Sequence, residues 1–304
     1  MTAPARGAVR TAMQVWLSLP FLPADGLRRL SLAAEEAGVT GLALSDHPCV
    51  PGTFASPYPY GGAKPVTLPP EVSLPDPLVV AAALAAATTR ARFMTAVLIA
   101  PLRHPVPLAK GAATVAAMSG GRFDLGVGAG WLREEFEALG QENFGRRGAV
   151  LNEMLPLLRR LWSGDLVAHD GEHFSFAPVA VNPPPPGALP IFVGGTSDAA
   201  LRRCAAYADG WVGANHSVEE LAGILARLAE ARAEAGTEDR PFEIRTGIRG
   251  TVTRARMTAL RELGVDSFLL APWQIGERRE SVYDLPVDDI AAALPDIVES
   301  IRTA

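Results

Sequence analysis

Residues 119–136 read Ser-Gly-Gly-Arg-Phe-Asp-Leu-Gly-Val-Gly-Ala-Gly-Trp-Leu-Arg-Glu-Glu-Phe, and this stretch decides the fold. It predicts a turn, a short buried strand over 122–127, a glycine-rich loop and the start of a charged helix. Gly126, Gly128 and Gly130 alternate where the strand would end, so the backbone there carries little side-chain bulk. Parallel α/β enzymes use such a strand end where a flat group lies against it.

The rest of the chain alternates short apolar runs with longer helical patterns. We expect strands at 13–19, 41–44, 93–99, 123–127, 190–193, 210–212, 243–251 and 267–270. We expect helices at 24–37, 77–89, 105–118, 146–162, 197–208, 217–235, 254–263 and 287–302. This alternation favours the α/β class and a single closed (β/α)8 TIM barrel, with an open doubly wound sheet as the alternative. The barrel domain should cover residues 13–304, after a disordered tail at residues 1–12.

Two segments exceed what a minimal barrel needs. Residues 48–75 are rich in proline and lack periodicity, which predicts an insertion on the C-terminal face of the barrel. Tyr58 and Tyr60 in this loop would line a substrate pocket. Residues 167–181 predict a hairpin that turns at Asp170-Gly171. Its two histidines, at positions 169 and 173, are not expected to bind a metal, because a turn does not place them on one helical face.

The composition argues against several classes of protein. The 304 residues carry a net charge of −5 with a pI near 5.6, which gives no basic surface for nucleic acid. The most apolar run, 78–87, is far shorter than the roughly 20 residues that cross a membrane. Cys49 and Cys204 are too few for a disulfide framework, so a reducing cytoplasm is the expected setting.

The second expected strand ends in Ser45-Asp46-His47-Pro48. In a parallel barrel the carboxyl ends of the strands face the active site. His47 changes protonation near neutral pH and is the candidate catalytic residue; the alternative is a histidine bonded to loop backbone. Asp46 cannot share the direction of His47 along an extended chain. We therefore expect Asp46 to face a cofactor or the backbone, and His47 to face the substrate.

A candidate anion site follows the fifth expected strand, in Pro190-Ile-Phe-Val-Gly-Gly-Thr-Ser-Asp-Ala-Ala200. Gly194 and Gly195 allow close approach to the backbone. Thr196 and Ser197 begin a helix, whose free N–H groups attract an anion. The alternative is an ordinary helix N-cap that binds nothing. We favour phosphate binding and expect a valine at position 195 to obstruct it while the helix tolerates the change.

These segments, together with Thr95-Ala-Val-Leu-Ile-Ala-Pro-Leu-Arg-His-Pro105, resemble the bacterial luciferase-like superfamily, especially its branch that uses the deazaflavin coenzyme F420. The resemblance implies a β-bulge in the third strand, with a non-prolyl cis peptide between Ala96 and Val97 that backs the cofactor ring. Arg103 and His104 come later in the loop and are expected to fix the following helix.

The same resemblance implies the placement of the cofactor and the reaction. The ring would lie against the third-strand bulge and against Gly128, Ala129 and Gly130, with the phosphate near 194–197. The enzyme would transfer a hydride between coenzyme F420 and a small organic substrate, with His47 handling a proton. A homodimer is implied, and a separate reductase that supplies reduced cofactor is a further candidate partner.

Two other functions stay open at this point. The first is an FMN-dependent monooxygenase on the same fold, which uses O2. The second is a protein that binds the cofactor without turnover of its own. Absorption spectra of the purified protein and a panel of substrates would separate the three hypotheses.

One position departs from the family pattern. In the sugar-phosphate dehydrogenases of this family a proton-donating glutamate follows the glycine loop, and Trp131 holds that position here. Sugar-phosphate oxidation is therefore in doubt, and a more apolar substrate floor is expected. Glu134 or Glu135 could replace the glutamate, but their charged run is typical of a solvated helix surface.

Overall fold

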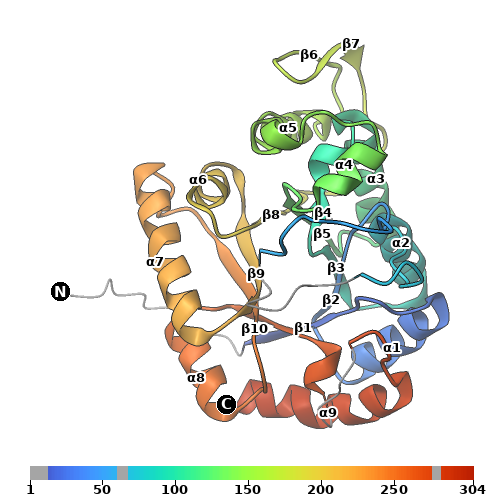
Figure 1. Cartoon of the computed structure of the whole chain (residues 1–304), viewed down its shortest axis with the longest axis vertical. Coiled ribbons are helices and arrows are strands. Elements are labelled where there is room, and N and C mark those ends of the chain that lie inside the picture. Colours follow the sequence, from blue (N-terminus) through green and yellow to red (C-terminus); the bar gives the residue numbers. More distant parts are fainter. Residues whose placement is uncertain (1–12, 60–67, 276–281) are drawn as a thin grey trace.

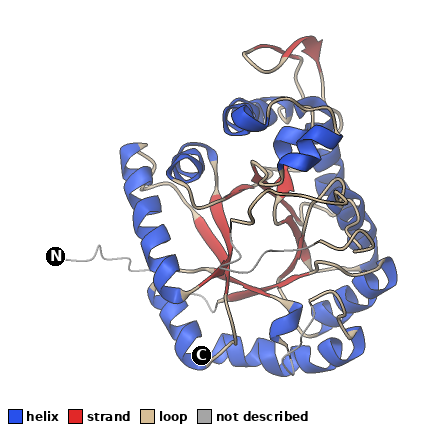
Figure 2. Ribbon diagram, viewed as in Figure 1, coloured by secondary structure: helices blue, strands red, loops and turns tan. Residues whose placement is uncertain are grey.

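The computed structural model describes residues 13–59, 68–275 and 282–304 and shows a closed barrel of parallel strands (Figures 1 and 2). Its staves are β1 (Gln14–Ser18), β2 (Gly41–Leu44), β3 (Arg92–Thr95) continued by β4 (Leu98–Ile99), β5 (Phe123–Gly128), β8 (Ile191–Gly194), β9 (Gly210–His216), β10 (Glu243–Ile248) and β11 (Ser267–Leu270). β3 pairs with β2 on one side and with β5 on the other, which closes the ring. The predicted barrel is confirmed, and the open sheet is excluded.

Helices surround this barrel (Figure 2). They are α1 (Ala24–Glu36), α2 (Pro77–Ala87), α3 (Pro105–Met118), α5 (Arg147–Leu161), α6 (Asp198–Tyr207), α7 (Val218–Glu234), α8 (Arg254–Glu262) and α9 (Val287–Thr303). Each lies where the sequence predicts a helix. A further short helix, α4 (Arg133–Ala138), follows the glycine loop. No helix within the described ranges is long and apolar enough to span a bilayer.

Local sequence explains where several helices begin. The Asp76 carboxylate accepts hydrogen bonds from the N–H groups of Leu78 and Val79, and Pro77 occupies the first helical position of α2. Ser217 and Glu220 form a reciprocal capping box at the start of α7. These caps satisfy N–H groups that have no acceptor within the helix.

The two insertions occupy different places. Residues 45–59 follow β2 and cross in front of β4 and β5 in Figure 1. The strands β6 (Val167–Asp170) and β7 (Ser175–Val179) form the predicted hairpin, which packs on the outer side of α5 through Glu153. Its turn is not at Asp170-Gly171 as predicted. Asp170 pairs with Ser175, so the chain reverses at Glu172-His173. The expected tail at 1–12 lies outside the described residues.

A buried ion cluster fills one layer of the barrel interior. Arg245 is 4% exposed, and its guanidinium carbon lies 4.1 and 3.9 Å from the ring centroids of Trp16 and Phe192. It donates to the carboxylates of Asp124 at 2.6 Å and Glu243 at 2.7 and 2.8 Å. These partners come from β1, β5, β8 and β10, so the arginine joins strands across the barrel.

The two rings flanking Arg245 fit because glycines face them. A Cβ atom on Gly41 would lie 2.5 Å from the Trp16 ring, and one on Gly210 would lie 2.3 Å from the Phe192 ring. Both distances are far below van der Waals contact. The glycines in β2 and β9 therefore provide the volume that large rings need inside a barrel.

Replacing Arg245 with Met should destabilise the fold strongly, because it leaves the Asp124 carboxylate buried without this partner. Removal of one member of a buried pair typically costs about 3–5 kcal/mol. Arg249→Met breaks an exposed pair with Glu220 and should cost less than about 1 kcal/mol. Urea unfolding measures the free energy of unfolding of both variants. Equal losses in the two variants would contradict the prediction.

Candidate active site at the barrel mouth

The third strand of the barrel, formed by β3 and β4, is interrupted by a bulge. Phe93 pairs with Phe123 in the lower half of β5, whereas Leu98 pairs with Val127 in the upper half. The β3–β4 side therefore contains one residue more than β5 over this interval, which defines a β-bulge. The peptide bond between Ala96 and Val97 is cis, as the resemblance implies. Both residues are half-exposed, so they face the open end of the barrel.

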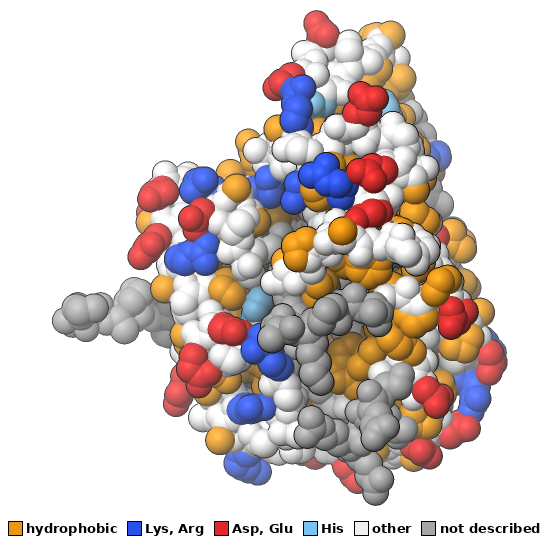
Figure 3. All heavy atoms as spheres, viewed as in Figure 1, with side chains coloured by type: hydrophobic (Ala, Val, Ile, Leu, Met, Phe, Trp, Pro, Cys, Tyr) orange, Lys and Arg blue, Asp and Glu red, His pale blue; other side chains and the backbone are white. Residues whose placement is uncertain are grey.

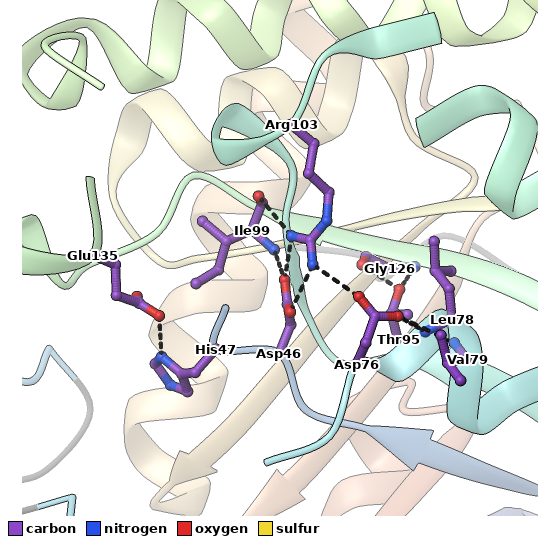
Figure 4. A network of polar contacts seen from close by, with 10 residues as sticks. All are labelled: Asp46, His47, Asp76, Leu78, Val79, Thr95, Ile99, Arg103, Gly126 and Glu135. Atoms are coloured by element: carbon purple, nitrogen blue, oxygen red, sulfur yellow. Dashed lines mark hydrogen bonds and ion pairs between the residues drawn. The ribbon is translucent and has the colours of Figure 1, made fainter. Parts of the chain in front are cut away.

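Thr95 joins the bulge to β5 (Figure 4). Its hydroxyl donates to the Gly126 carbonyl at 2.6 Å and accepts from the Gly126 N–H at 3.0 Å. A Cβ atom on Gly126 would lie 1.9 Å from the Thr95 carbonyl oxygen. Glycine is therefore required at position 126 by the strand itself.

The other alternating glycines are also required by close contacts with the neighbouring strand. A Cβ on Gly128 would lie 2.7 Å from Val97, and one on Gly130 would lie 2.7 Å from Ile99. A Cβ on Gly194 would also meet Val97, at 3.0 Å from the nearest methyl carbon. The structure thus brings together Val97, Gly128 and Gly194, three of the predicted cofactor residues. Their small size makes room for the bulge, and a cofactor contact at Gly128, Ala129 or Gly130 stays a prediction.

Asp46 anchors the strand beyond the bulge (Figure 4). Its carboxylate accepts from the Ile99 N–H at 2.8 Å and binds the Arg103 guanidinium at 2.6 and 2.9 Å. The Arg103 guanidinium also lies 3.5 Å from Asp76, the cap of α2. Of the two alternatives for Asp46, a cofactor or the backbone, the structure shows a backbone contact, and a cofactor contact of Asp46 stays a prediction. Arg103 was expected to fix α3, but it holds Asp46 instead, while His104 does cap α3 through the Val106 N–H.

His47 points away from Asp46 and contacts a buried acid (Figure 4). Its Nδ1 lies 3.0 Å from Oε1 of Glu135, whose side chain has no exposed surface. Burial raises the pKa of Glu135, and hydrogen bonds from His47 and from the Cys49 backbone oppose this rise. The prediction that Glu135 lies on a solvated surface is wrong. A single helical turn is too short to show from its sequence which face is buried.

Aromatic side chains stand beside His47. The Trp131 ring makes edge contacts with His47, Phe54 and Tyr58, at centroid distances of 6.1, 5.9 and 5.1 Å. The predicted pocket residues Trp131 and Tyr58 therefore lie together, and Tyr60 lies outside the described residues. Hydrophobic side chains gather around the middle of the face in Figure 3, whereas most charged side chains lie nearer its rim.

Glu134 fixes the loop that carries this aromatic wall. Its carboxylate accepts from the Ala55 N–H at 2.7 Å and from the Ser56 hydroxyl at 2.7 Å. The Ser56 hydroxyl in turn accepts from the Arg133 N–H at 3.0 Å. Glu134, the second glutamate that was expected on a solvated surface, is thus also held by hydrogen bonds, which join α4 to the loop after β2.

The predicted anion site is a strand end followed by the start of α6. Ser197 accepts from the Ala200 N–H at 3.2 Å, which is the N-cap that formed the alternative. The N–H groups of the first helical turn precede the first bond within the helix and have no acceptor there. Arg227 donates to the Thr196 carbonyl and to Asp198, which brings a positive charge to this end. Anion binding is compatible with this geometry but stays a prediction.

The expected behaviour of a valine at position 195 needs correction. Gly195 has a φ of +112°, and a Cβ atom there would lie 2.9 Å from the Ala200 side chain. Valine would strain the backbone and crowd the helix, so the substitution cannot isolate phosphate binding. Histidines 169 and 173 lie in the hairpin, and no cluster of three metal-ligating side chains occurs in the described ranges.

Residues 2–292 match the sequence profile of the luciferase-like monooxygenases. The chain belongs to this family. A protein of unknown function from Mycobacterium tuberculosis is 38% identical to it over 218 residues, which are 71% of this chain and 74% of that protein. The crystal structure of monooxygenase RslO1 from Streptomyces bottropensis has the same fold, with a TM-score of 0.74 and 20% identity over 95% of this chain and 98% of that one.

Two relatives carry named activities. FMNH2-dependent dimethylsulfone monooxygenase of Pseudomonas fluorescens is 32% identical over 164 residues, 53% of this chain and 44% of that protein. F420-dependent glucose-6-phosphate dehydrogenase of Nakamurella multipartita is 32% identical over 195 residues, 63% of this chain and 52% of that protein. Because luciferase-like enzymes use F420 or a flavin, this chain is an oxidoreductase of that kind.

In this luciferase-like protein, Gly126→Ala should destabilise the fold even without cofactor. The added Cβ meets backbone rather than a movable side chain, so we expect a loss at the upper end of the range of about 1–3 kcal/mol that overpacking typically costs. Gly223→Ala is the control, because that glycine lies in α7 with open space around it. This substitution should raise the free energy of unfolding by about 0.5–1 kcal/mol. Chemical unfolding of the cofactor-free variants measures both effects. If the stability of Gly126→Ala were unchanged, the glycine would be needed for ligand binding and not for the fold.

Proposed function

We propose that this protein binds coenzyme F420 at the barrel mouth and transfers a hydride between it and a small, moderately apolar organic substrate. The observation that carries the proposal is the His47–Glu135 pair at the end of β2, the strand whose Leu44 carbonyl accepts from the N–H of the half-exposed Ala96 at 2.7 Å. A proton carrier next to a flat, partly open surface is what hydride transfer to or from a carbonyl group needs. Coenzyme F420, when bound, would supply the hydride chemistry, and the protein supplies position and the proton.

The described residues fit such a cofactor. Ala96 and Val97 offer an apolar, half-exposed surface, and Gly194 beside Val97 is itself partly exposed. Thr196 and the first turn of α6 offer hydrogen-bond donors to a phosphate, whereas the charge of Arg227 is already paired with Asp198. Ser197 contributes less than the sequence predicts, because its hydroxyl oxygen already caps α6.

The substrate side of the mouth is aromatic. Trp131, Phe54 and Tyr58 present ring surface next to His47, and Glu134 holds their loop in place. Such a wall favours an apolar or flat substrate over a sugar phosphate, whose charge would need cationic partners. The F420-dependent glucose-6-phosphate dehydrogenase is therefore a guide to the cofactor and not to the substrate.

An FMN-dependent monooxygenase is the second candidate function. The Pseudomonas fluorescens relative uses FMNH2, and its similarity to this chain is comparable to that of the F420-dependent relative. A monooxygenase would also need a source of reduced flavin, such as a separate reductase. Binding of a cofactor without turnover is the third candidate, and a substrate panel tests it. We place each of these activities in the cytoplasm, which agrees with two free cysteines.

We expect coenzyme F420 to bind more tightly than FMN, by about tenfold or more, equivalent to about 1.4 kcal/mol. The reason is the combination of the Asp46–His47 strand end with the bulge at Ala96–Val97, both nearer to the deazaflavin branch. Fluorescence titration of the purified protein with each cofactor measures both dissociation constants. Equal or tighter binding of FMN would favour the monooxygenase.

His47→Ala should lower kcat without loss of folding or cofactor affinity. A proton-transfer group typically contributes about 10²–10⁴-fold in rate. His104→Ala is the matched control, because this histidine caps α3 at the surface and does not touch Glu135. A His47→Ala variant that turns over normally, or that mainly unfolds, would make His47 a structural residue.

We further propose that the protein forms a homodimer through the outer faces of α2 and α3. Helix α2 contains no charged residue, and Val79 there and Met118 on α3 are 68% and 61% exposed. A helix that is apolar on all sides is usually covered. Light scattering should give twice the chain mass, and Val79→Glu combined with Met118→Glu should give monomers. A wild-type monomer at micromolar concentration would contradict this.

A further inference from the structure

Glu135 is the most completely buried carboxyl group at the barrel mouth, and its only described side-chain hydrogen-bond partner is His47. Oε1 lies 3.0 Å from His47 Nδ1, while Oε2 is buried without a hydrogen-bond partner among the described residues. The His47 side chain is 16% exposed and that of Glu135 is not exposed at all. A buried carboxylate that leaves one oxygen unsatisfied costs free energy, so stability alone does not explain it.

We propose that Glu135 is a positioning residue, which accepts a hydrogen bond from His47 Nδ1–H and thereby presents Nε2 to the substrate. The proposal rests on the proposed function, because it gives His47 its orientation for that proton transfer. The two ring nitrogens of an imidazole lie on opposite sides, so a bond at Nδ1 turns Nε2 away from α4. A carboxylate at Nδ1 also selects the tautomer, since it accepts and cannot donate when ionised.

The position of Glu135 is fixed from both sides. The neighbouring Glu134 ties the start of α4 to residues 55 and 56. On the other side, Phe136 is fully buried and packs against Gly130, whose Cβ position would lie 3.1 Å from its ring. The helix can therefore neither rotate nor slide without breaking one of these contacts. This rigidity is what a residue that orients a proton carrier requires.

The surroundings of the pair define its charge. Burial, and to a lesser extent the charge of Asp46, raises the pKa of Glu135, although Arg103 binds the Asp46 carboxylate. The Cys49 backbone donates toward Glu135, and burial together with Glu135 raises the pKa of the Cys49 thiol. No arginine or lysine of the described residues forms an ion pair with Glu135, so His47 is its only counter-ion there.

The proton transfer then balances at His47. In the direction of substrate reduction His47 starts as the imidazolium. Its Nε2–H bond breaks and the proton passes to the substrate oxygen, while Nδ1–H stays bonded to Glu135. Nε2 afterwards regains a proton from water. In the oxidative direction Nε2 takes the proton of a substrate hydroxyl group. The negative charge of Glu135 stabilises the imidazolium form in both directions.

Two substitutions separate the hydrogen bond from the charge. Glu135→Gln keeps an acceptor oxygen for Nδ1–H but removes the charge, and Glu135→Leu removes both. Glu137→Gln is the matched control, because Glu137 lies on the same helix turn, is exposed and does not contact His47. Nitrogen-15 NMR of the ring nitrogens of His47 in the cofactor-free protein reports the tautomer directly, with His47→Ala used to assign the signals.

We expect the wild type and Glu137→Gln to show Nδ1–H as the protonated nitrogen of neutral His47. Glu135→Gln should keep this tautomer, and Glu135→Leu should give a mixture. In turnover assays we expect Glu135→Leu to lower kcat by about 10–100-fold with little change in cofactor affinity, and Glu135→Gln to recover most of this loss. In Glu135→Gln the limb of the kcat profile that depends on His47, acidic for substrate oxidation and alkaline for substrate reduction, should move to lower pH, because the imidazolium loses its counter-charge.

Three results would overturn the proposal. The first is protonation at Nε2 alone in neutral wild-type His47. The second is an unchanged His47 spectrum in Glu135→Leu. The third is Glu135→Gln with a wild-type pH profile and a Glu135→Leu variant that only unfolds more readily. Because the NMR signals need neither F420 nor a substrate, they decide the role of Glu135 even if the protein proves to use FMN.

Discussion

A strand that bulges loses main-chain hydrogen bonds to its neighbours. In the third strand of this barrel, formed by β3 and β4, two polar side chains replace those hydrogen bonds. The Thr95 hydroxyl satisfies both the N–H and the carbonyl of Gly126, and the Asp46 carboxylate receives the Ile99 N–H. Unpaired buried backbone groups cost free energy comparable to a lost hydrogen bond, so the bulge requires these substitutes. The half-exposed surface at Ala96 and Val97, and with it the site, depends on them.

The same dipeptide that anchors the bulge also places His47, the proton carrier of the proposed reaction. Along an extended strand end, neighbouring side chains point in opposite directions. Asp46 therefore reaches β4 and Arg103, while His47 reaches α4 and Glu135. Any movement of His47 along the chain would pull Asp46 away from the Ile99 N–H. Structural anchoring and chemistry are thus coupled through a single peptide unit.

Periodicity and strand composition were sufficient to predict the barrel, its helices and the strand end at Asp46–His47. They could not say what fills the space beside a glycine. Gly126, Gly128 and Gly130 suggest room for a ligand, yet the neighbouring strand occupies that space. Nor could the sequence place Glu135 or Arg245. The Arg-Glu-Glu-Phe-Glu run is too short for a helical pattern, and the partners of Arg245 meet only when the barrel closes.

The buried Asp124 in the barrel interior and the buried Glu135 at the mouth differ in how completely they are neutralised. In the interior, Arg245 lies between two rings and binds both Asp124 and Glu243, and Arg92 adds a second cation to Asp124. At the mouth, Glu135 has a titratable histidine in place of an arginine. A permanently charged partner locks a buried carboxylate in one state, whereas an imidazole is a group that can accept and release a proton. The choice of counter-ion therefore makes one carboxylate part of the framework and leaves the other able to react.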